Sequence, residues 1–178
     1  KWTVPLSLGD SHKGYRVLGT STDYFKYYRY ANKQNLAFNS GKPFAGVFDA
    51  VVGAEVAEKL NYKVGDSIIL AHGAGSTSFA KHDNKPFTIT GILKLTGTPV
   101  DRTVHVSLES IEAIHVGWES GSKPGIELPA ESVLKMDLQP KVITAFLAGL
   151  KSRSTTFRLQ RQINEYPREA LLAAVPGV

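Results

Sequence analysis

The chain of 178 residues contains no cysteine. Disulfide bonds, thiol nucleophiles and thiolate metal sites are therefore excluded, while the redox compartment stays open, because cysteine-free chains suit the periplasm and the cytosol alike. No run of residues approaches 18 consecutive apolar side chains, and no basic start followed by an apolar stretch indicates a signal peptide. The chain as given is expected to be soluble.

The chain also lacks a strong excess of charge of one sign. The 21 basic and 16 acidic residues leave a net charge of +5, without a dense lysine or arginine run. This balance predicts a mildly basic surface rather than a nucleic-acid groove, and the basic and aromatic signature of nucleic-acid binding is missing as well. We therefore expect no nucleic-acid partner.

The two ends of the sequence indicate a piece of a longer protein. The chain opens without methionine on Lys1-Trp-Thr-Val-Pro5 and stops on the apolar residues 173–178. An apolar end of this kind is what a lead into a more hydrophobic segment would leave. With 42% hydrophobic residues, the piece has an ordinary composition for a globular core.

Short strands and short helices alternate along the chain. Apolar periodicity and turn residues predict strands at 15–20, at the start of 49–60, at 67–71, 86–96 and 142–150, a turn, strand and helix within 98–114, and helices after residue 21, at 54–60 and at 154–166. This pattern predicts an α+β fold, a mixed sheet with short helices packed on it that can divide into two lobes.

Three local details sharpen these predictions. In the helix 54–60, Val56, Ala57 and Leu60 share one face that can pack on a sheet. Ser107 is suited to cap the helix that follows, because its hydroxyl can accept a hydrogen bond from a free helical amide. Strict alternation from 86 to 96 predicts a half-buried strand. Its inward side chains would be Phe87, Ile89, Gly91, Leu93 and Leu95.

The glycine- and proline-rich stretch 116–130 predicts a boundary or an inserted loop. It would separate a core lobe, 1–115, from a C-terminal strand and helix, 131–178. Trp118 lies in this stretch, and because tryptophan is enriched at interface hot spots it is a candidate partner anchor. The aromatic residues between 24 and 30 are expected to pack in the core rather than to form an exposed surface.

A search for catalytic groups finds none that we would assign. His72-Gly-Ala-Gly-Ser-Thr77 lacks the Gly-Lys-Ser/Thr ending of a phosphate-binding loop and is read as a hairpin tip. Residues 119–122 lack the strand and helix that frame a nucleophilic serine. The carboxylate pairs fit solvated helix or loop faces. Asp101 and Arg102 indicate an ion pair or an aspartate-capped turn.

The five histidines likewise show no metal-binding spacing of the His-Glu-x-x-His kind. His72 and His82 could approach each other in three dimensions, but a zinc site also needs a third ligand. His105, on an expected strand, is read as a hydrogen-bonded sheet residue. We therefore expect no metal, cofactor or catalytic residue.

The order of the motifs carries a resemblance. Residues 49–60, 64–70, 87–93 and 98–114 follow one another as they do in the extracytoplasmic core domain of MacB-like and FtsX-like ABC transporter permeases. Gly19-Thr-Ser-Thr-Asp-Tyr-Phe25 is similar to the start of the MacB-like core domain, and residues 142–165 are similar to the last strand and helix of a bacterial permease subgroup. The resemblance covers most of the chain.

The resemblance implies a single extracytoplasmic, periplasmic domain of an inner-membrane protein, with 131–178 returning to the core and leading to a transmembrane helix. It implies as partners a cytoplasmic ABC ATPase subunit, a second permease subunit, and a periplasmic adaptor or cargo. The domain would not be an enzyme, and it would couple cytoplasmic ATP hydrolysis to movement or export of a substrate. The loops at 72–84 and 116–130 depart from the family pattern.

A second hypothesis stays open. Val64-Gly-Asp-Ser-Ile68 and the strand-rich middle of the chain also occur in small barrels, so the chain could be a free-standing β-rich module that binds a ligand or nucleic acid. Apolar flanks of about twenty residues would favour the permease, whereas polar flanks would favour the module.

Overall fold

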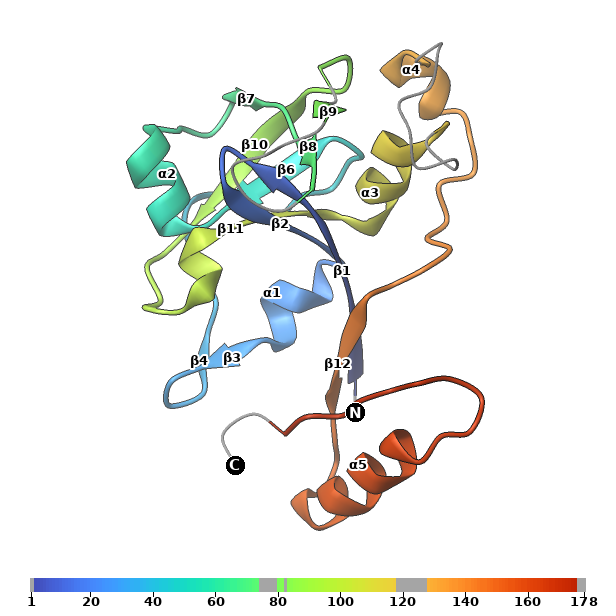
Figure 1. Cartoon of the computed structure of the whole chain (residues 1–178). Coiled ribbons are helices and arrows are strands. Elements are labelled where there is room, and N and C mark those ends of the chain that lie inside the picture. Colours follow the sequence, from blue (N-terminus) through green and yellow to red (C-terminus); the bar gives the residue numbers. More distant parts are fainter. Residues whose placement is uncertain (1, 74–79, 82, 118–127, 176–178) are drawn as a thin grey trace. The chain divides into compact units, whose positions relative to one another are not determined.

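A computed structural model describes residues 2–73, 80–81, 83–117 and 128–175 and shows a mixed α and β architecture (Figure 1). The chain divides into two compact units, Val4–Phe146 and a smaller one made of Lys1–Thr3 with Leu147–Val178. Within the described ranges, no helix has both the length and the apolar character needed to cross a bilayer.

A mixed sheet forms the body of the larger unit. Hydrogen-bonded neighbours follow the order β5-β10-β6-β11-β2-β1-β8-β9, with β7 beside β10 and β12 beside β1. β10 runs parallel to β6 and β11 parallel to β2, whereas β11 and β6 are antiparallel, so the predicted α+β fold with a mixed sheet is confirmed. The strands are β1 (Trp2–His12), β2 (Tyr15–Thr20), β5 (Phe38–Gly41), β6 (Asp49–Val52), β7 (Ser67–Ile68), β8 (Ala71–His72), β9 (Ala80–Lys81), β10 (Phe87–Leu93), β11 (Thr103–Ser107) and β12 (Ala145–Gly149).

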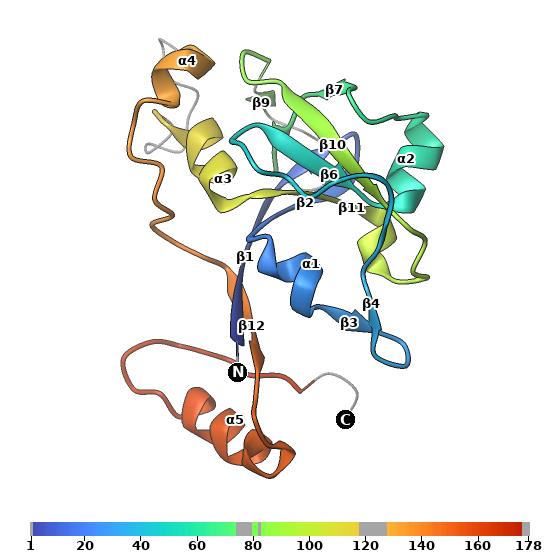
Figure 2. The same ribbon diagram turned by 180° about the vertical axis from the view of Figure 1, so that it is seen from behind.

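The helices are short, as predicted. A separate pair of two-residue strands, β3 (Arg29–Tyr30) and β4 (Gln34–Asn35), follows the first of them. Figures 1 and 2 show α2 and α3 at opposite ends of the sheet of the larger unit. The helices are α1 (Asp23–Tyr27), α2 (Ala54–Leu60), the 3₁₀ turn η1 (Pro99–Arg102), α3 (Leu108–His115), α4 (Ala130–Val133), the 3₁₀ turn η2 (Arg153–Thr155) and α5 (Thr156–Asn164).

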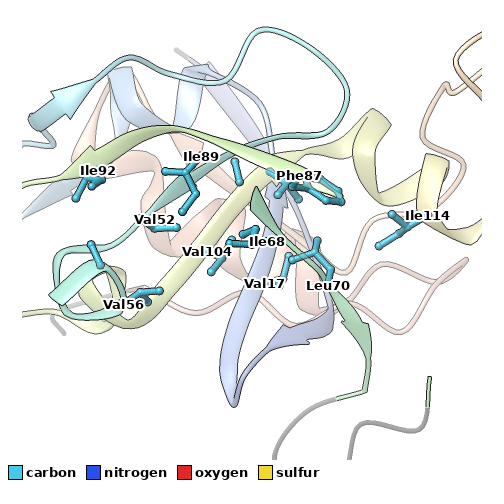
Figure 3. Packing of buried hydrophobic residues seen from close by; sticks show 13 residues of the cluster. Val17, Val52, Val56, Ile68, Leu70, Phe87, Ile89, Ile92, Val104 and Ile114 are labelled. Carbon is cyan, nitrogen blue, oxygen red and sulfur yellow. The ribbon is translucent and has the colours of Figure 1, made fainter. Parts of the chain in front are cut away.

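The central strands β6 and β11 are buried on both faces. Successive side chains of a strand point to opposite faces. Val104 and Val106 join the main apolar core, drawn in Figure 3, while His105 between them contacts the rings of α1 on the other face. Each face therefore has its own layer of packed side chains, which explains why Ala50, Val51 and Val52 of β6 are apolar and buried in succession.

Aromatic side chains build the layer over the second face. Tyr24 and Phe25 of α1 are buried, and the Phe25 ring lies 5.4 Å from the rings of both Phe38 and Phe44. Burial raises the pKa of Tyr24, which stays neutral as a result. For Tyr24 and Phe25, the expectation of core packing is confirmed.

The helix α2 matches the predicted range residue for residue. Its apolar face, Val56 and Ala57, is buried in the main core. Gly53 precedes it at a point where a Cβ atom would collide with the backbone carbonyl of Val100, so only glycine fits there. Asn61 ends the helix in the left-handed conformation, with φ of 54°.

The prediction of a half-buried strand at 86–96 is wrong in two places. Ile92, expected to face outward, is only 8% exposed, because β10 lies between β5 and β6 and a register shift between Ile89 and Gly91 interrupts the alternation. Leu95, expected to face inward, is 72% exposed, because the strand ends at Leu93.

The predicted buried strand at 142–150 is also corrected. The strand begins at Ala145 rather than at Val142, which is 77% exposed, and Phe146 within it is 47% exposed. β12 pairs with β1, and this pairing satisfies backbone groups without covering both faces of the strand. Apolar content alone therefore predicted more burial than the position provides.

The smaller unit joins the first described residues to the last segment of the chain. The Trp2 ring lies directly over Gly149, where any side chain would collide with the indole. Within α5, Thr156, Leu159 and Ile163 are half-buried, as the predicted spacing requires, but none of the residues of this helix is fully buried. Tyr166, the fourth member of the predicted stripe, is exposed.

Ser107 caps α3 as predicted, since its hydroxyl accepts a hydrogen bond from the Ser110 amide at 3.0 Å. We expect Ser107→Ala to lower the free energy of unfolding by about 1 kcal/mol, because the amide loses its acceptor. The measurement is urea unfolding followed by circular dichroism. Ser132→Ala, an exposed serine within α4, is the control and should stay within about 0.5 kcal/mol of the wild type. Equal effects at the two positions would contradict the capping role.

Candidate functional site

An open cavity of about 380 Å³ lies in the larger unit between α3 and the segment that follows α4. Its polar wall includes His72, Glu112, His115 and Asp137, and its apolar wall includes Leu138. Leu138 packs with Ala113 and Val133 in a small satellite core, which fixes the segment after α4 against α3.

Three elements bring a cluster of polar residues to the edge of this cavity. Asp10 of β1 stands opposite His72 of β8 in the antiparallel ladder, so the two side chains are neighbours. A register shift between Leu8 and Ser11 bends β1 at this point, the kind of irregularity that re-aims a side chain. His115 is the last residue of α3.

The three side chains meet through one atom each. His72 Nδ1 lies 3.2 Å from Asp10 Oδ1 and 3.0 Å from His115 Nε2. His115 Nε2 in turn lies 3.4 Å from the same Asp10 oxygen. These atoms form a closed triangle of two nitrogens and one oxygen, and they are the group of the described residues whose donor atoms could hold a metal ion. We call these residues the Asp10–His72–His115 cluster.

Burial makes the charge of Asp10 costly unless a positive group balances it. Its side chain is 2% exposed, and the ion-pair contacts found for it are with the two imidazoles, which are 45% and 27% exposed. A buried carboxylate is stabilised by a cation or by strong hydrogen bonds. The cluster can thus bind either a proton or a metal ion next to Asp10.

The other two described histidines are buried away from this cavity. His105 lies on β11 with no exposed surface, and its Nδ1 is 3.3 Å from the Val51 carbonyl oxygen. Burial lowers its pKa to about 4. Burial also lowers the pKa of His12, whose ring nitrogens contact the Ile69 carbonyl and the Tyr62 hydroxyl at 2.7 and 2.8 Å.

The expectation for His105 is corrected in part. Its ring is a sheet residue, as predicted, but its Nε2 atom has no hydrogen-bond partner within the described ranges of the chain. The Tyr24 and Phe25 rings surround it at centroid distances of 5.4 and 5.8 Å. Only one of the two ring nitrogens is therefore satisfied.

Other predicted residues are placed as follows. His82, the partner considered for His72, and Trp118, the candidate anchor, lie outside the described residues, so the role of Trp118 stays a prediction. His72 lies in strand β8 rather than in a hairpin tip. The predicted boundary 116–130 falls within the range of the larger unit, with 118–127 outside the described residues, and also stays a prediction.

The sequence predicted either an ion pair or an aspartate-capped turn at Asp101 and Arg102, and Asp101 forms the capped turn. Its carboxylate accepts hydrogen bonds from the Thr96 amide at 2.9 Å and the Gly97 amide at 2.7 Å. Arg102 instead contacts Glu55 of α2 at 3.4 Å, an exposed pair that contributes little to stability. The contacts of both residues are therefore structural, and the alternative of an ion pair between them is not the one that forms.

Sequence reasoning missed Asp10 and His115 as members of a site. His72 is 62 positions from Asp10 and 43 from His115, so no spacing rule connects them. The available signal was an aspartate in one strand, β1, and a histidine at the end of another, β8. The pairing of these two strands, which brings Asp10 and His72 together, cannot be predicted from local sequence.

Comparison with known families decides what kind of domain this is. The sequence model of the MacB-like periplasmic core domain matches residues 3–166. The chain belongs to this family. A MacB-like core domain is a periplasmic domain of an ABC-type transporter permease, so the predicted family and the predicted extracytoplasmic location are both confirmed. A match over nearly the whole chain favours the permease over the free-standing module.

One solved structure shares the fold of this MacB-like domain, and a second was compared with it. The extracellular domain of the noncanonic ABC-type transporter YknZ from Gram-positive bacteria superposes with a TM-score of 0.50 at 14% identity, over 92% of this chain and 74% of that one. A domain of a putative permease from Porphyromonas gingivalis gives 0.41 at 12% identity, over 94% and 63% of the two chains. A search of curated proteins finds no match.

Proposed function

We propose that this MacB-like domain couples ATP hydrolysis in the cytoplasm to movement or export of a substrate, by docking a periplasmic adaptor or cargo and moving with the membrane helices of its permease. The observation that carries the proposal is the family match over residues 3–166. ATP hydrolysis would belong to a separate ABC subunit, and the domain itself would perform no catalytic step. A second permease subunit would complete the transporter.

Exposed apolar side chains in the smaller unit support a docking role. Phe157 on α5 is 64% exposed, and Leu172 is 88% exposed. Tyr166 and Leu171 between them are 44% and 38% exposed. The four side chains lie within residues 157–172, and a contiguous apolar surface formed from them would be typical of a surface that meets a partner.

The proposal is tested on the full-length permease that contains this chain. The permease is coexpressed with candidate ABC ATPase subunits, crosslinked in the membrane and purified. We expect an ATP-hydrolysing subunit to copurify. Purification without an ATPase subunit under crosslinking would contradict the coupling function.

The docking surface has its own test, because the chain lacks cysteine. Phe157→Cys places a single reactive thiol on α5, and Ser132→Cys places one on the exposed face of α4 as the control. With a photoactivatable thiol reagent attached, we expect Phe157→Cys to crosslink a periplasmic protein or cargo and Ser132→Cys to crosslink much less. Equal labelling at the two positions would contradict the assignment of this surface.

A further inference from the structure

We infer that the Asp10–His72–His115 cluster is a binding site for a divalent transition metal ion such as Zn²⁺. The inference concerns the larger unit alone and does not rest on the proposed transport function. Nothing in the family match or in the fold comparison assigns a metal to these residues.

The size of the triangle fits a metal centre. Two imidazole nitrogens and one carboxylate oxygen bound to zinc at 2.0–2.2 Å in a tetrahedron would stand about 3.3 Å apart. The three separations here are 3.0, 3.2 and 3.4 Å. One ion placed above the triangle could therefore contact all three atoms with only small side-chain movements.

Hydrogen bonds alone explain the triangle less well. The three contacts are made among only three atoms, His72 Nδ1, His115 Nε2 and Asp10 Oδ1, so each atom takes part in two contacts. A ring nitrogen holds at most one hydrogen, which lies in the plane of the ring and can point well toward only one acceptor. A cation above the triangle balances the buried Asp10 charge and interacts with all three donor atoms at once.

The ligand types select the class of metal. Two nitrogens and one oxygen suit Zn²⁺ and its neighbours in the first transition row, whereas Mg²⁺ and Ca²⁺ favour all-oxygen sites. The site also sits at the C-terminal end of α3, where the partial negative charge of the helix favours a cation.

The cavity leaves room for a further ligand. His72 and His115 both line it, so an ion held by them would face the open space. Glu112 lies one helical turn before His115 and also lines the cavity, with its carboxylate accepting a hydrogen bond from the Lys141 amide at 3.2 Å. A water molecule or an incoming polar group could therefore take the fourth position.

The ion would join segments that are far apart in the sequence. Asp10 comes from β1, His72 from β8 and His115 from α3. β8 is only two residues long, so it contributes few hydrogen bonds of its own. A bound ion would hold this short strand and the end of α3 to β1.

The test uses the 178-residue chain without a histidine tag. After treatment with a chelator and its removal, the chain is titrated with Zn²⁺ by isothermal calorimetry near neutral pH. We expect one ion per chain and a higher melting temperature in its presence, since an ion that binds only the folded state stabilises it. Co²⁺ serves as a spectroscopic probe, and we expect the visible absorption of a tetrahedral site.

Variants locate the ion. Asp10→Asn, His72→Gln and His115→Gln each remove one ligand, and we expect each to weaken Zn²⁺ binding by at least about tenfold. Asp137→Asn is the matched control: Asp137 lines the same cavity outside the triangle, and an asparagine oxygen can still accept the hydrogen bond from the Gln139 amide. It should bind zinc as the wild type does.

Two results would overturn the inference. One is the absence of stoichiometric Zn²⁺ binding by the wild-type chain, which would leave a proton shared among the three residues as the account of the cluster. The other is equal binding by the wild type and the three ligand variants, which would place the ion elsewhere. If Asp10→Asn does not fold without metal, as circular dichroism would show, the more exposed His72→Gln decides the question.

Discussion

Lowering the pH from 7 to 5 is expected to destabilise the folded chain by about 2 kcal/mol through His105 alone. Burial depresses the pKa of this residue from 6.5 to about 4, so its ring stays neutral in the folded state over this range. The unfolded chain takes up a proton near pH 6.5. Since the unfolded state binds more protons, stability falls as the pH falls through this window, and it is fully present above it.

His12 adds to the same trend, because burial lowers its pKa as well. Urea unfolding at pH 7, 6 and 5 with a chelator present measures the slope. His105→Leu removes the titrating ring and keeps an apolar side chain between the aromatic rings of α1, so its stability should depend less on pH. Parallel slopes for the wild type and His105→Leu would show that this histidine does not titrate as its burial requires.

The second large effect is expected at Phe87. This residue starts β10, has no exposed surface, and lies in the main core together with Ile68 and Leu70 (Figure 3). Phe87→Ala removes most of an aromatic ring and leaves a cavity that the rigid sheet cannot close. We expect the free energy of unfolding to fall by about 3 to 5 kcal/mol.

The control for this substitution is the same change on the surface. Phe157→Ala, on α5, removes a ring that is 64% exposed and should alter stability by no more than about 0.5 kcal/mol. Both variants are compared by denaturant unfolding and by near-ultraviolet circular dichroism. A small loss at Phe87 would mean that the sheet collapses around the site or that the core is less tightly packed than the structure shows.

Local sequence predicted those elements whose limits are set by local chemistry. The helix 54–60 was predicted to the residue, because glycine precedes it, asparagine ends it and its apolar spacing has the period of a helix. The Ser107 cap was predicted for a similar reason, since the acceptor and its amide lie three residues apart. Such features need no knowledge of the distant chain.

Burial could not be predicted in the same way. Whether Ile92 is covered depends on which strands flank β10 and on the register shift that turns this side chain into the main core, and both are set by contacts between distant segments. The same reason explains the failure at Val142, which precedes β12 and stays exposed although its sequence is apolar. The candidate metal site is the extreme case, because all three of its residues come from different elements.

The two units also differ in whether their residues are synthesised in one continuous stretch. Val4–Phe146 is one continuous stretch, whereas the smaller unit is assembled from the beginning of the chain and from its last segment. Domains tend to fold in order as they are synthesised. Trp2 is made before the larger unit, yet the glycine that it packs against is residue 149, so the smaller unit can close only after the whole larger unit has been synthesised.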